Sequence, residues 1–578
     1  MTSVATVQPA LRANSSVVRP AARWRLRDPF AYQKGIAKFP PLVATVLAAR
    51  GITTRAQADA FYKPWLQADY DPLQLPGMHE AIRRVRKAIA EDETIALYGD
   101  FDVDGVTSIA VLQTGLRPLG AKTVNYIPDR FKEGYGVNVE AVTELRTRGA
   151  GLLITADCGI SSVVEVAHAN SLGMDVIILD HHTVPDEMPA ALAAVNPKRL
   201  DSPYPFTELA AVGVAFRFLQ ALYEDAGRTL DESQFLDLVA LGTVIDVAPL
   251  VDENRRIVVA GLDQMQRTLR PGLEALVRVS RVNPESMNAE SLGFALGPRM
   301  NAAGRIQHAY LALDLLLAEN MGVANNLAEQ LDGLNRRRQE QTEKAYALAE
   351  EIFAGVSDPL IMVGSPHIHS GIVGIVAGRL AERYHRPAIV YEAGETTSRA
   401  SCRSIPEFDI VAAIRKEKSL LVRHGGHRAA AGFTVNNRDL DMLRDRLINT
   451  AAELLDERAL QPVIEIDAET PLAGLTPIEI KGLMRFEPCG HGNRKPVLLS
   501  RNVRLVEQKL VGSDQSHLKV AFKEGPVRWD GIAFRQGQAQ TAGEVDIVYS
   551  LQTGLRGMAE LQVHDIVPSA QQRPLDVS

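Results

Sequence analysis

Residues Ile95–Ser108 read IALYGDFDVDGVTS. A short apolar run, Ile95–Tyr98, is followed by a glycine and then by three aspartates at alternate positions, Asp100, Asp102 and Asp104. The run predicts a buried parallel strand, and open α/β sheets place their ligands at the carboxyl ends of such strands. While the backbone stays extended, alternation by two points the three carboxylates roughly the same way. Close negative charges raise one another's pKa unless a cation lies among them, so the stretch predicts a divalent cation bound by oxygen ligands. The alternative is an acidic surface turn with an Asp–Gly step.

Predicted strands and helices alternate further along the chain. Strands are predicted at Thr123–Ile127, Leu152–Thr155 and Val176–Leu179, and helices at Asn138–Arg148 and Ser162–Ser171. This rhythm is typical of a doubly wound parallel sheet. Asp157 follows the second of these strands, and Asp180, His181 and His182 follow the third. Because the carboxyl ends of parallel strands meet at one edge, we expect side chains from three strands to share one metal site.

A fourth segment supplies a further aspartate. Phe235–Val244 is rich in leucine and valine and predicts a helix, after which the sequence GTVIDVAPL contains Asp246. An isolated carboxylate in such an apolar neighbourhood is costly to bury. The structural alternative is a helix N-cap, but Pro249 argues against a helix that continues immediately. We therefore predict that Asp246 is a metal ligand.

Composition and charge narrow the class of protein. The 578 residues are 46% hydrophobic and 23% charged, as is ordinary for a soluble globular protein of several domains. The net charge of −7 argues against a generally basic nucleic-acid coat, so a polyanion would need a local basic groove. Cys158, Cys402 and Cys489 form no CxxC pair, which argues against a zinc ribbon and favours a reducing, cytoplasmic location. No apolar run approaches the ~18 residues of a membrane helix, so no membrane partner is expected.

Changes of pattern divide the chain into domains. We predict a disordered tail at 1–40, a catalytic domain at 41–265, a connector at 266–355, a second α/β domain at 356–456, a β-barrel at 457–567 and a tail at 568–578. Five arginines and no acidic residue precede Asp28, so an organelle transit peptide is the alternative for the first tail. A helical pattern runs from Pro41 to about Tyr70. The connector contains a polar helix, Val323–Phe353, which at 1.5 Å per residue is about 45 Å long and can span two domains.

The last two domains have features of phosphate and single-strand binding. After the strand Leu360–Val363 comes a glycine-rich turn and the helix Val373–Tyr384, and the amides at such a helix N-terminus favour a phosphate. Short alternating strands from Val463 onward predict an oligonucleotide-binding barrel. In that barrel, aromatic side chains are more often core than stacking platforms. Candidates for stacking on a single strand are Phe522, Trp529 and Phe534, beside Lys519, Lys523 and Arg528.

Eight motifs in one order carry a resemblance to a known family. GDFDVDG, TADCGI, the triplet Asp180–His182 and GTVIDVAPL resemble the four motifs of the DHH phosphoesterases. GPRMNAAGRI at Gly297–Ile306, HSGIVGIVAGRL at His369–Leu380 and GGHRAAAGF at Gly425–Phe433 are similar to the connector and DHH-associated domain of the RecJ branch, the single-strand-specific DNA exonucleases. The segment with EPCGHGN at Glu487–Asn493 resembles the oligonucleotide-binding domain of that branch.

The resemblance covers roughly residues 41–567, and it departs from the family pattern at Cys489, where we expect an aromatic side chain. It implies an α/β protein with a parallel-sheet DHH catalytic domain, a long connecting helix, a smaller α/β DHH-associated domain and a C-terminal OB-type β-barrel. It also implies a metal-dependent exonuclease that degrades single-stranded DNA from the 5′ end to 5′-mononucleotides, in recombination and repair. Single-strand-binding protein and a helicase are the implied protein partners, and the oligomeric state stays open.

Residues of the site follow from the strand ends together with this resemblance. The predicted metal ligands are Asp100, Asp102, Asp104, Asp157, His181 and Asp246, and with His182 they form the predicted catalytic set. The predicted substrate-binding residues are Arg130, Arg299, Asn301, Arg305, His369, Ser401, Arg403, Gly426 and His427. Two divalent cations, Mn²⁺ or Mg²⁺, would polarise the phosphoryl group and activate water, and the imidazole of His181 shifts the preference towards manganese. The resemblance implies that Asp157 bridges the cations and that Ser401 and Arg403 approach the 5′-phosphate end. For His182, contact with substrate or metal is expected, with a purely structural histidine as the alternative.

Two hypotheses from other functional classes compete with the exonuclease hypothesis. The chain could be a DHH phosphodiesterase of short oligonucleotides or cyclic dinucleotides, although such substrates require neither a barrel nor a long helix. It could also be a non-catalytic scaffold that binds single-stranded DNA, although loss of catalysis usually leaves gaps in a ligand set and all six predicted ligands are retained. A pyrophosphatase is the least favoured, because it leaves the last hundred residues without a role.

Overall fold

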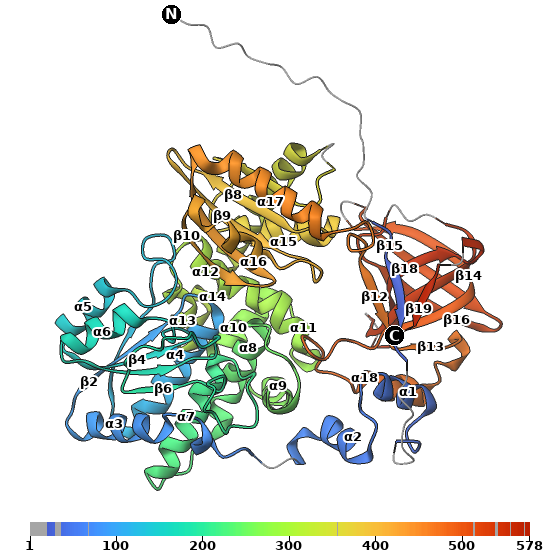
Figure 1. Ribbon diagram of the computed structural model, residues 1–578. Coiled ribbons are helices and arrows are strands. Elements are labelled where there is room, and N and C mark those ends of the chain that lie inside the picture. The colour runs from blue at the N-terminus through green and yellow to red at the C-terminus, as the bar shows by residue number, and fades with distance from the viewer. Residues whose placement is uncertain are drawn as a thin grey trace, which may run out of the picture. The chain divides into compact units, whose positions relative to one another are not determined.

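The computed structural model describes residues 20–28, 36–66, 69–354, 357–512, 515–537, 541–554, 557–571 and 573–577. The chain divides into two compact units (Figure 1). One is made of Arg25–Arg336 with Glu465–Ser578, and the other of Met1–Trp24 with Arg337–Ile464. Within the described ranges, no helix is both long enough and apolar enough to cross a membrane.

The first unit contains the predicted parallel sheet, with strand order β3-β2-β4-β5-β6. Its strands are β2 (Thr94–Gly99), β3 (Lys122–Tyr126), β4 (Ala150–Ala156), β5 (Asp175–Leu179) and β6 (Ala193–Val195). Ile95 and Leu97 pack in one core with helices α3 (Met78–Ala90), α4 (Val103–Leu116) and α7 (Ala211–Asp225). Ala96 and Tyr98 face a second core with α5 (Val139–Thr147) and α6 (Val163–Ser171). Helices therefore cover both faces of the sheet, which confirms the doubly wound prediction.

Three strands of this sheet end at the same level. The last residues of β2, β4 and β5 lie in parallel register with one another. Asp100, Asp157 and Asp180 follow those residues directly, so they leave neighbouring strands at one edge. This is the arrangement that the strand-and-helix rhythm predicts.

The backbone after β2 does not stay extended as far as the sequence suggests. Helix α4 begins at Val103, directly after Asp102. Asp102 is the N-cap, and its carboxylate accepts hydrogen bonds from the backbone N–H groups of Asp104 (3.0 Å) and Gly105 (3.2 Å). An aspartate in this position satisfies N–H groups that would otherwise lack partners, which starts the helix early. The expected alternation by two is therefore wrong for Asp104, which lies in the first helical turn.

Gly105 is the point where α4 touches the end of β2. A Cβ atom at this residue would lie 2.4 Å from the carbonyl oxygen of Asp100 and 2.5 Å from its nitrogen. We expect Gly105→Ala to lower the free energy of unfolding by about 1–3 kcal/mol, because overpacking against backbone forces it to shift. The matched control is Gly333→Ala in α14 (Met321–Phe353), where a Cβ meets no atom within 4 Å and helix propensity should add about 0.5–1 kcal/mol. Urea unfolding in EDTA measures both, and equal effects would contradict this packing.

A helical layer follows the sheet in the first unit. Its elements are α8 (Leu236–Ile245), α9 (Asp252–Arg267), α10 (Pro271–Ser280), α11 (Ala289–Ser291), the π-helix η6 (Leu292–Leu296), α12 (Gly297–Ile306) and α13 (Tyr310–Leu316). Asp246 is the C-cap of α8 and not a helix N-cap. Helix α14 has 33 residues and is about 50 Å long at 1.5 Å per residue, which confirms the long connecting helix. The boundary between the two units falls within it, between Arg336 and Arg337.

The second unit contains a mixed five-stranded sheet of order β10-β11-β9-β8-β7. Its strands are β7 (Ile361–Ser365), β8 (Ala388–Ala393), β9 (Thr397–Arg403), β10 (Leu421–His427) and β11 (Ala430–Asn436). Only the pair β7–β8 is parallel among them. Helix α15 (Val373–Tyr384) packs on one face, and α16 (Ile410–Lys416) with α17 (Leu440–Leu454) packs on the other. The predicted second α/β domain is confirmed, including the bounds of α15.

The C-terminal part of the first unit is a closed barrel. Its strands are β14 (Leu498–Val511), β15 (His517–Glu524), β16 (Val527–Ala533), β17 (Gly543–Thr553) and β18 (Ala559–Pro568). β14 pairs with both β15 and β17, which closes the sheet and confirms the predicted barrel. Phe522 is fully buried in its core and Trp529 packs partly buried against it, so the core alternative holds for these two. Phe534 is 43% exposed.

The helical segment that precedes the catalytic sheet packs with this barrel. It forms two helices, α1 (Pro41–Ala49) and α2 (Arg55–Tyr62), rather than one continuous pattern, because Gly51 between them has φ +76°. Apolar side chains of both helices, among them Val43 and Tyr62, share the hydrophobic core of the barrel strands. This segment falls within the predicted catalytic domain at 41–265, although its apolar side chains pack with the barrel.

Both predicted tails contribute strands. β1 (Arg23–Leu26), β12 (Val463–Ile466) and β19 (Leu575–Val577) form a three-stranded sheet of order β12-β1-β19. Trp24 in β1 is fully buried. The prediction of a disordered tail is therefore wrong for β1, because a strand pairing between the two ends of a chain leaves no local periodicity in either end. The remaining parts of the first tail, 1–19 and 29–35, and with them the question of a transit peptide, lie outside the described residues.

Candidate metal centre

The six predicted ligands and His182 come together at the carboxyl edge of the parallel sheet. Their ligand atoms form three overlapping groups, and within each group all atoms lie within 4.8 Å of one another. The groups are Asp100 with Asp102 and Asp157, Asp157 with His181 and His182, and Asp104 with His181 and Asp246. Asp157 and His181 each belong to two groups, so they join the set into one site.

His181 lies at the centre of this set. Its Nε2 is 3.2 Å from Asp157 Oδ1 and 3.8 Å from Asp104 Oδ2, and its Nδ1 is 3.8 Å from Asp246 Oδ2. Burial, together with the charge of His182, lowers the pKa of His181 to about 3. The imidazole is therefore neutral over the physiological range, which is the form that binds metals.

Asp104 is held against the N-terminus of α7. Its two carboxylate oxygens accept hydrogen bonds from the backbone N–H groups of Ala211 (2.7 Å) and Val212 (2.9 Å). A helix N-terminus stabilises negative charge. Burial nevertheless raises the pKa of Asp104 to about 7, and the charge of Asp102 adds to the shift.

The other carboxylates experience the same conflict between burial and charge. Burial raises the pKa of Asp157 and of Asp100 well above the usual range, and the charge of Asp102 is the next contribution at both. Burial and the charge of Asp104 raise the pKa of Asp246 to about 9. Asp157 also has a left-handed backbone, φ +64°, which aspartate adopts more readily than most residues. The fold thus holds five carboxylates close together, although burial and mutual repulsion disfavour their charged forms. A bound cation would offset this repulsion.

The donor set fits hard divalent cations. Asp100 Oδ1 and His181 Nε2 are buried and have no hydrogen-bond partner among the residues that the structure describes. Buried polar atoms without a partner are costly, and a metal ion would satisfy both. Carboxylate oxygens with one imidazole are ligands that Mg²⁺ and Mn²⁺ accept.

Asp180 organises both histidines, although the sequence analysis gave it no role of its own. Its Oδ1 accepts hydrogen bonds from the backbone N–H groups of His181 (2.7 Å) and His182 (3.1 Å) and lies 2.7 Å from His182 Nδ1. Burial acts to raise the pKa of Asp180, but the hydrogen bond and charge of His182 outweigh it and hold the pKa at about 2. The Asp-His-His order was the signal that could have found this function.

Tyr135 is a second residue that the sequence analysis missed. Its hydroxyl lies 3.1 Å from His182 Nε2 and donates to the carbonyl of Asp157 (3.3 Å), while the residue is 52% exposed. The two ring nitrogens of His182 are thus occupied by Asp180 and Tyr135. Burial acts to lower the pKa of His182, but Asp180 outweighs it and the pKa is raised. Tyr135 follows no strand end and matches no motif, so nothing in the sequence marked it.

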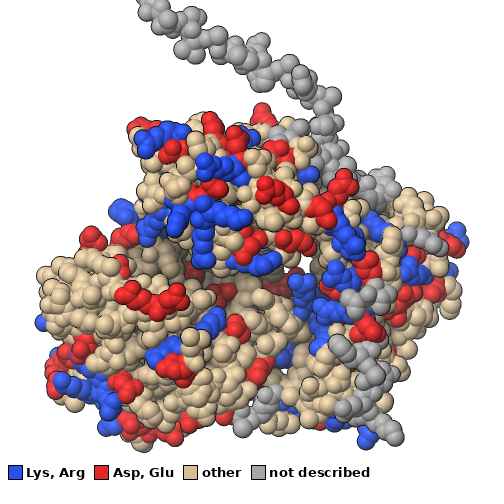
Figure 2. Space-filling model, viewed as in Figure 1, with Lys and Arg blue, Asp and Glu red and all other residues tan. Residues whose placement is uncertain are grey.

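The predicted basic residues of the first unit lie in different environments. The Arg130 guanidinium lies over the ring of Phe101, 4.8 Å from its centroid, directly beside the metal ligands. Helix α12, which carries Arg299, Asn301 and Arg305, approaches the same place, since a Cβ on Gly304 would be 2.8 Å from the Phe101 carbonyl oxygen. Arg299 itself donates to Asp332 (2.9 Å) and to the Ala295 carbonyl (2.8 Å), so it also braces α12 against α14. On the face shown in Figure 2, basic and acidic side chains are interspersed, in line with the net charge of −7.

The predicted substrate residues of the second unit gather on one face of its sheet. Ser401 and Arg403 alternate along β9, and Arg403 Nη1 donates to Ser401 Oγ (3.2 Å). Strand register places His427, Ala430 and Arg403 in one row across three strands, so His427 shares the face of Arg403. A Cβ on Gly374 of α15 would be 3.0 Å from Ser401 Oγ and 3.2 Å from Arg403 Nη2, so the helix start also borders this cluster. Gly426 adjoins His427 with φ +134°, and His369 precedes α15 and accepts from the N–H of Gly371 (3.1 Å).

Three family descriptions match the chain. The DHH family N-terminal domain matches residues 94–243, the DHHA1 domain matches 357–457 and the RecJ OB domain matches 466–564. These three matches follow the order of the sheet, the second unit and the barrel.

Relatives with curated names match over most of the chain. The single-stranded-DNA-specific exonuclease RecJ of Salmonella typhimurium is 37% identical, with 91% of this chain and 95% of that protein covered. RecJ of Bacillus subtilis is 40% identical over 86% of this chain, which spans 64% of that longer relative. Two crystal structures of RecJ from Thermus thermophilus each align over 96% of this chain. The complex with Mn²⁺ has a TM-score of 0.82 at 30% identity, with 80% of that chain covered, and the complex with Mg²⁺ has 0.76 at 28%, with 79% covered.

Proposed function

The chain belongs to the RecJ family of single-stranded-DNA-specific exonucleases and is a metal-dependent phosphodiester hydrolase, and we propose that it degrades single-stranded DNA from the 5′ end to 5′-mononucleotides. The observation that carries this proposal is the convergence of ligand side chains from four separate segments on one sheet edge. Solvent-exposed acidic turns would not gather in this way, because like charges repel. The cofactor is Mn²⁺ or Mg²⁺.

We assign the ligands to Asp100, Asp102, Asp104, Asp157, His181 and Asp246, with Asp157 between two cations. Membership of Asp157 in two of the three ligand groups supports its bridging position. When bound, two divalent cations polarise the phosphoryl group, lower the pKa of water and stabilise the leaving oxygen.

His182 has a different part in this proposal. Asp180 accepts from its Nδ1 and so fixes the orientation of the ring, which leaves Nε2 facing the hydroxyl of Tyr135. The raised pKa of His182 lets it hold a proton on Nε2, and a phosphoryl oxygen of the substrate would replace the Tyr135 hydroxyl as the acceptor of that proton.

In this proposal, residues of the second unit determine from which end the strand is degraded. Ser401, Arg403 and His427 form a partly basic cluster beside the start of α15, and such a cluster suits a terminal phosphate dianion. We therefore propose that it receives the 5′-phosphate, while Arg130, Asn301, Arg305 and Arg299 hold the chain near the metals.

Arg403 should discriminate between strands with and without a 5′-phosphate. We expect Arg403→Lys to raise KM for a 5′-phosphorylated strand about tenfold and to change KM for a 5′-hydroxyl strand little, because lysine loses the fork that grips a phosphate. Arg399→Lys is the matched control, since Arg399 lies on the same face of β9 and is exposed. An equal change of KM on both strands would contradict the assignment.

A pair of end-labelled strands tests the polarity. A single strand labelled at its 3′ end should shorten gradually into a ladder in the presence of Mn²⁺, while a strand labelled at its 5′ end should release labelled mononucleotide at once. A matching blunt duplex should stay intact. The reverse pattern of labels would overturn the 5′ assignment.

Two alternatives remain as outcomes of that experiment. Cleavage of di- and trinucleotides alone would favour the short-substrate phosphodiesterase, and binding without cleavage would favour the scaffold. The barrel and the 33-residue helix support the long-substrate function. Single-strand-binding protein and a helicase as partners, and a cytoplasmic location, remain predictions.

A further inference from the structure

The segment that follows Asp246 holds a strained backbone. Val247 has φ +63°, a left-handed conformation that a β-branched residue rarely adopts, and its side chain is 62% exposed. Such strain persists only where the surrounding structure fixes it. Because Val247 adjoins a proposed ligand, whatever holds residues 247–250 also determines where the Asp246 carboxylate lies.

A loop of the barrel domain lies directly on this segment. We name residues 486–493 the docking loop. The N–H of Leu250 donates to the carbonyl of His491 (2.7 Å). A Cβ on Gly492 would be 2.9 Å from Pro249 Cβ, and one on Gly490 would be 2.8 Å from Leu250 Cδ1. The backbone of the docking loop therefore packs against residues 249–250 at a distance that only glycine allows.

Arg255 of α9 fixes the docking loop from the catalytic side. It is buried at 3% exposure and donates to the carbonyls of Phe486 (3.1 Å), Glu487 (2.9 Å) and Pro488 (3.0 Å). Its fourth bond goes to the carbonyl of Phe61 in α2 (3.0 Å). All four acceptors are backbone carbonyls, so Arg255 fixes the course of the loop backbone and does not form an ion pair here.

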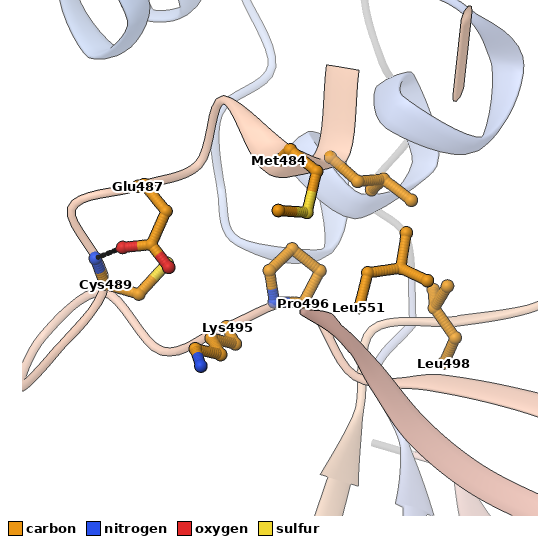
Figure 3. Close-up of a pocket in the computed structure, with 8 residues that line it drawn as sticks. Met484, Glu487, Cys489, Lys495, Pro496, Leu498 and Leu551 are labelled. Carbon is orange, nitrogen blue, oxygen red and sulfur yellow. Dashed lines mark hydrogen bonds between the residues drawn. The ribbon is translucent and has the colours of Figure 1, made fainter. Parts of the chain in front are cut away.

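The docking loop is also closed from within. The Asn493 side chain donates to the carbonyls of Phe486 and Pro488, both at 2.9 Å. The Glu487 carboxylate accepts from the N–H of Cys489 (2.7 Å), and Figure 3 shows this contact at the edge of a small pocket under the loop. Met484 and Leu498 line the same pocket. Hydrogen bonds of its own thus fix the shape of the loop.

A second path runs from residue 249 to another ligand. Asn254 is fully buried, and its side chain donates to the carbonyls of Pro249 (3.1 Å) and Glu208 (2.6 Å). Glu208 lies three residues before Ala211, and the N–H groups of Ala211 and Val212 hold the Asp104 carboxylate. The contacts at residue 249 therefore affect the positions of two proposed ligands, Asp246 and Asp104.

We propose that the docking loop is a positioning element of the metal centre: by holding residues 247–250 it keeps Asp246, and through Asn254 also Asp104, in place to bind the cation. The barrel domain then has two functions, one towards the DNA strand and one towards the metal. This inference rests on the ligand assignment of the proposed function. Partners that orient metal ligands typically change metal affinity or activity about 10- to 100-fold when they are lost.

The test is calorimetric titration of the full chain with Mn²⁺ alone. Gly492→Ala adds a methyl group that pushes the docking loop off Pro249, and we expect about tenfold weaker Mn²⁺ binding. Gly557→Ala is the matched control in the same domain, because Gly557 has φ +73° against +71° for Gly492 but no atom of the described residues within 4 Å of the added Cβ. It carries the same backbone strain without the contact, and its isotherm should equal that of the wild type.

A second variant covers the case in which Gly492→Ala does not fold. Arg255→Lys keeps the positive charge but cannot reach all four carbonyls, and circular dichroism with thermal unfolding in EDTA shows whether each variant is folded. We expect weaker Mn²⁺ binding again, with the KM for a single strand at saturating Mn²⁺ unchanged. Folded variants with wild-type isotherms would overturn the inference.

A third variant separates this inference from the proposed function. Asp246→Asn should weaken Mn²⁺ binding at least as much as Gly492→Ala does. If it weakens binding and the docking-loop variants do not, only the inference fails. If it leaves the isotherm unchanged, the ligand assignment fails and the inference falls with it.

Discussion

Asp157→Asn should lower kcat/KM on single-stranded DNA roughly a thousandfold, with Mn²⁺ or Mg²⁺ present. Asp157 belongs to two of the three ligand groups, so its loss disturbs both proposed cation positions. Metal ions contribute several kcal/mol of transition-state stabilisation in hydrolysis, and each 1.36 kcal/mol is a factor of ten in rate. The fall should appear mainly in kcat, because the residues proposed to bind the strand are unchanged. Steady-state release of nucleotides from a labelled single strand measures it.

The matched control for this prediction is Asp186→Asn. Asp186 lies in the loop after the neighbouring strand β5 and is exposed, outside the ligand groups. It should retain wild-type activity. Because burial and neighbouring carboxylates oppose the charge of Asp157, the Asp157→Asn protein should unfold in EDTA at a temperature no lower than the wild type. If the Asp157→Asn protein kept kcat/KM within a factor of three of the wild type, the assignment of Asp157 as a metal ligand would be wrong.

Without divalent metal, the free energy of unfolding should fall by about 5 kcal/mol between pH 6 and pH 9. In the folded chain the pKa of Asp104 is raised to about 7 and that of Asp246 to about 9, from an ordinary value of 3.8. The folded state therefore retains protons that the unfolded state has already released. The stability from these two groups is complete below their unfolded pKa and is lost as the pH rises through the folded values. Urea unfolding in EDTA at pH 6, 7.5 and 9 measures the slope.

Mn²⁺ should reverse this dependence, because bound cations favour the charged carboxylates and bind more tightly as the protons leave. The rise in unfolding temperature on adding Mn²⁺ should therefore be larger at pH 9 than at pH 6. Asp246→Asn should remove part of the pH slope and most of the Mn²⁺ effect. If the free energy of unfolding in EDTA rose with pH, the folded state would not disfavour the charged form of these carboxylates.

The sequence predicts which side chains converge at the sheet edge because the strand ends are local features. The apolar runs of β2, β4 and β5 are each followed by an aspartate, and the parallel register of the strands brings these aspartates to one edge. The prediction that the three aspartates alternate along an extended backbone is wrong at Asp104, and the reason is again local. Asp102 can either continue an extended strand or cap a helix, and its bonds to two N–H groups decide for the helix. A pattern of alternating aspartates cannot show which of these two conformations the backbone adopts.

Long-range pairings are what the sequence cannot reveal. The strands β1 and β19 pair across almost the whole chain, and helices α1 and α2 bury their apolar faces in a barrel more than four hundred residues away. In each case the local pattern is compatible with a tail or with the nearest domain, and only tertiary packing decides. The docking loop belongs to the same class, since GHGN at residues 490–493 matches a family motif without saying which surface it touches.

Partners of a recognised residue are equally hard to predict. His182 stands out in the sequence, but Tyr135, which contacts its second ring nitrogen, comes from a loop between β3 and α5. Phe522 agrees with the expectation that aromatic side chains of a small barrel are more often core, since it lies between two lysines in the sequence but is fully buried. Alternation along β15 turns Phe522 inward and both lysines outward.

The proposed metal centre can be located in crystals of the full chain grown with Mn²⁺ and measured at the manganese absorption edge. We expect the strongest anomalous peaks at the carboxyl edge of the parallel sheet, with Asp157 in contact with two of them and His181 and Asp246 in contact with at least one. Peaks only at surface carboxylates, or a sheet edge without any, would contradict this assignment.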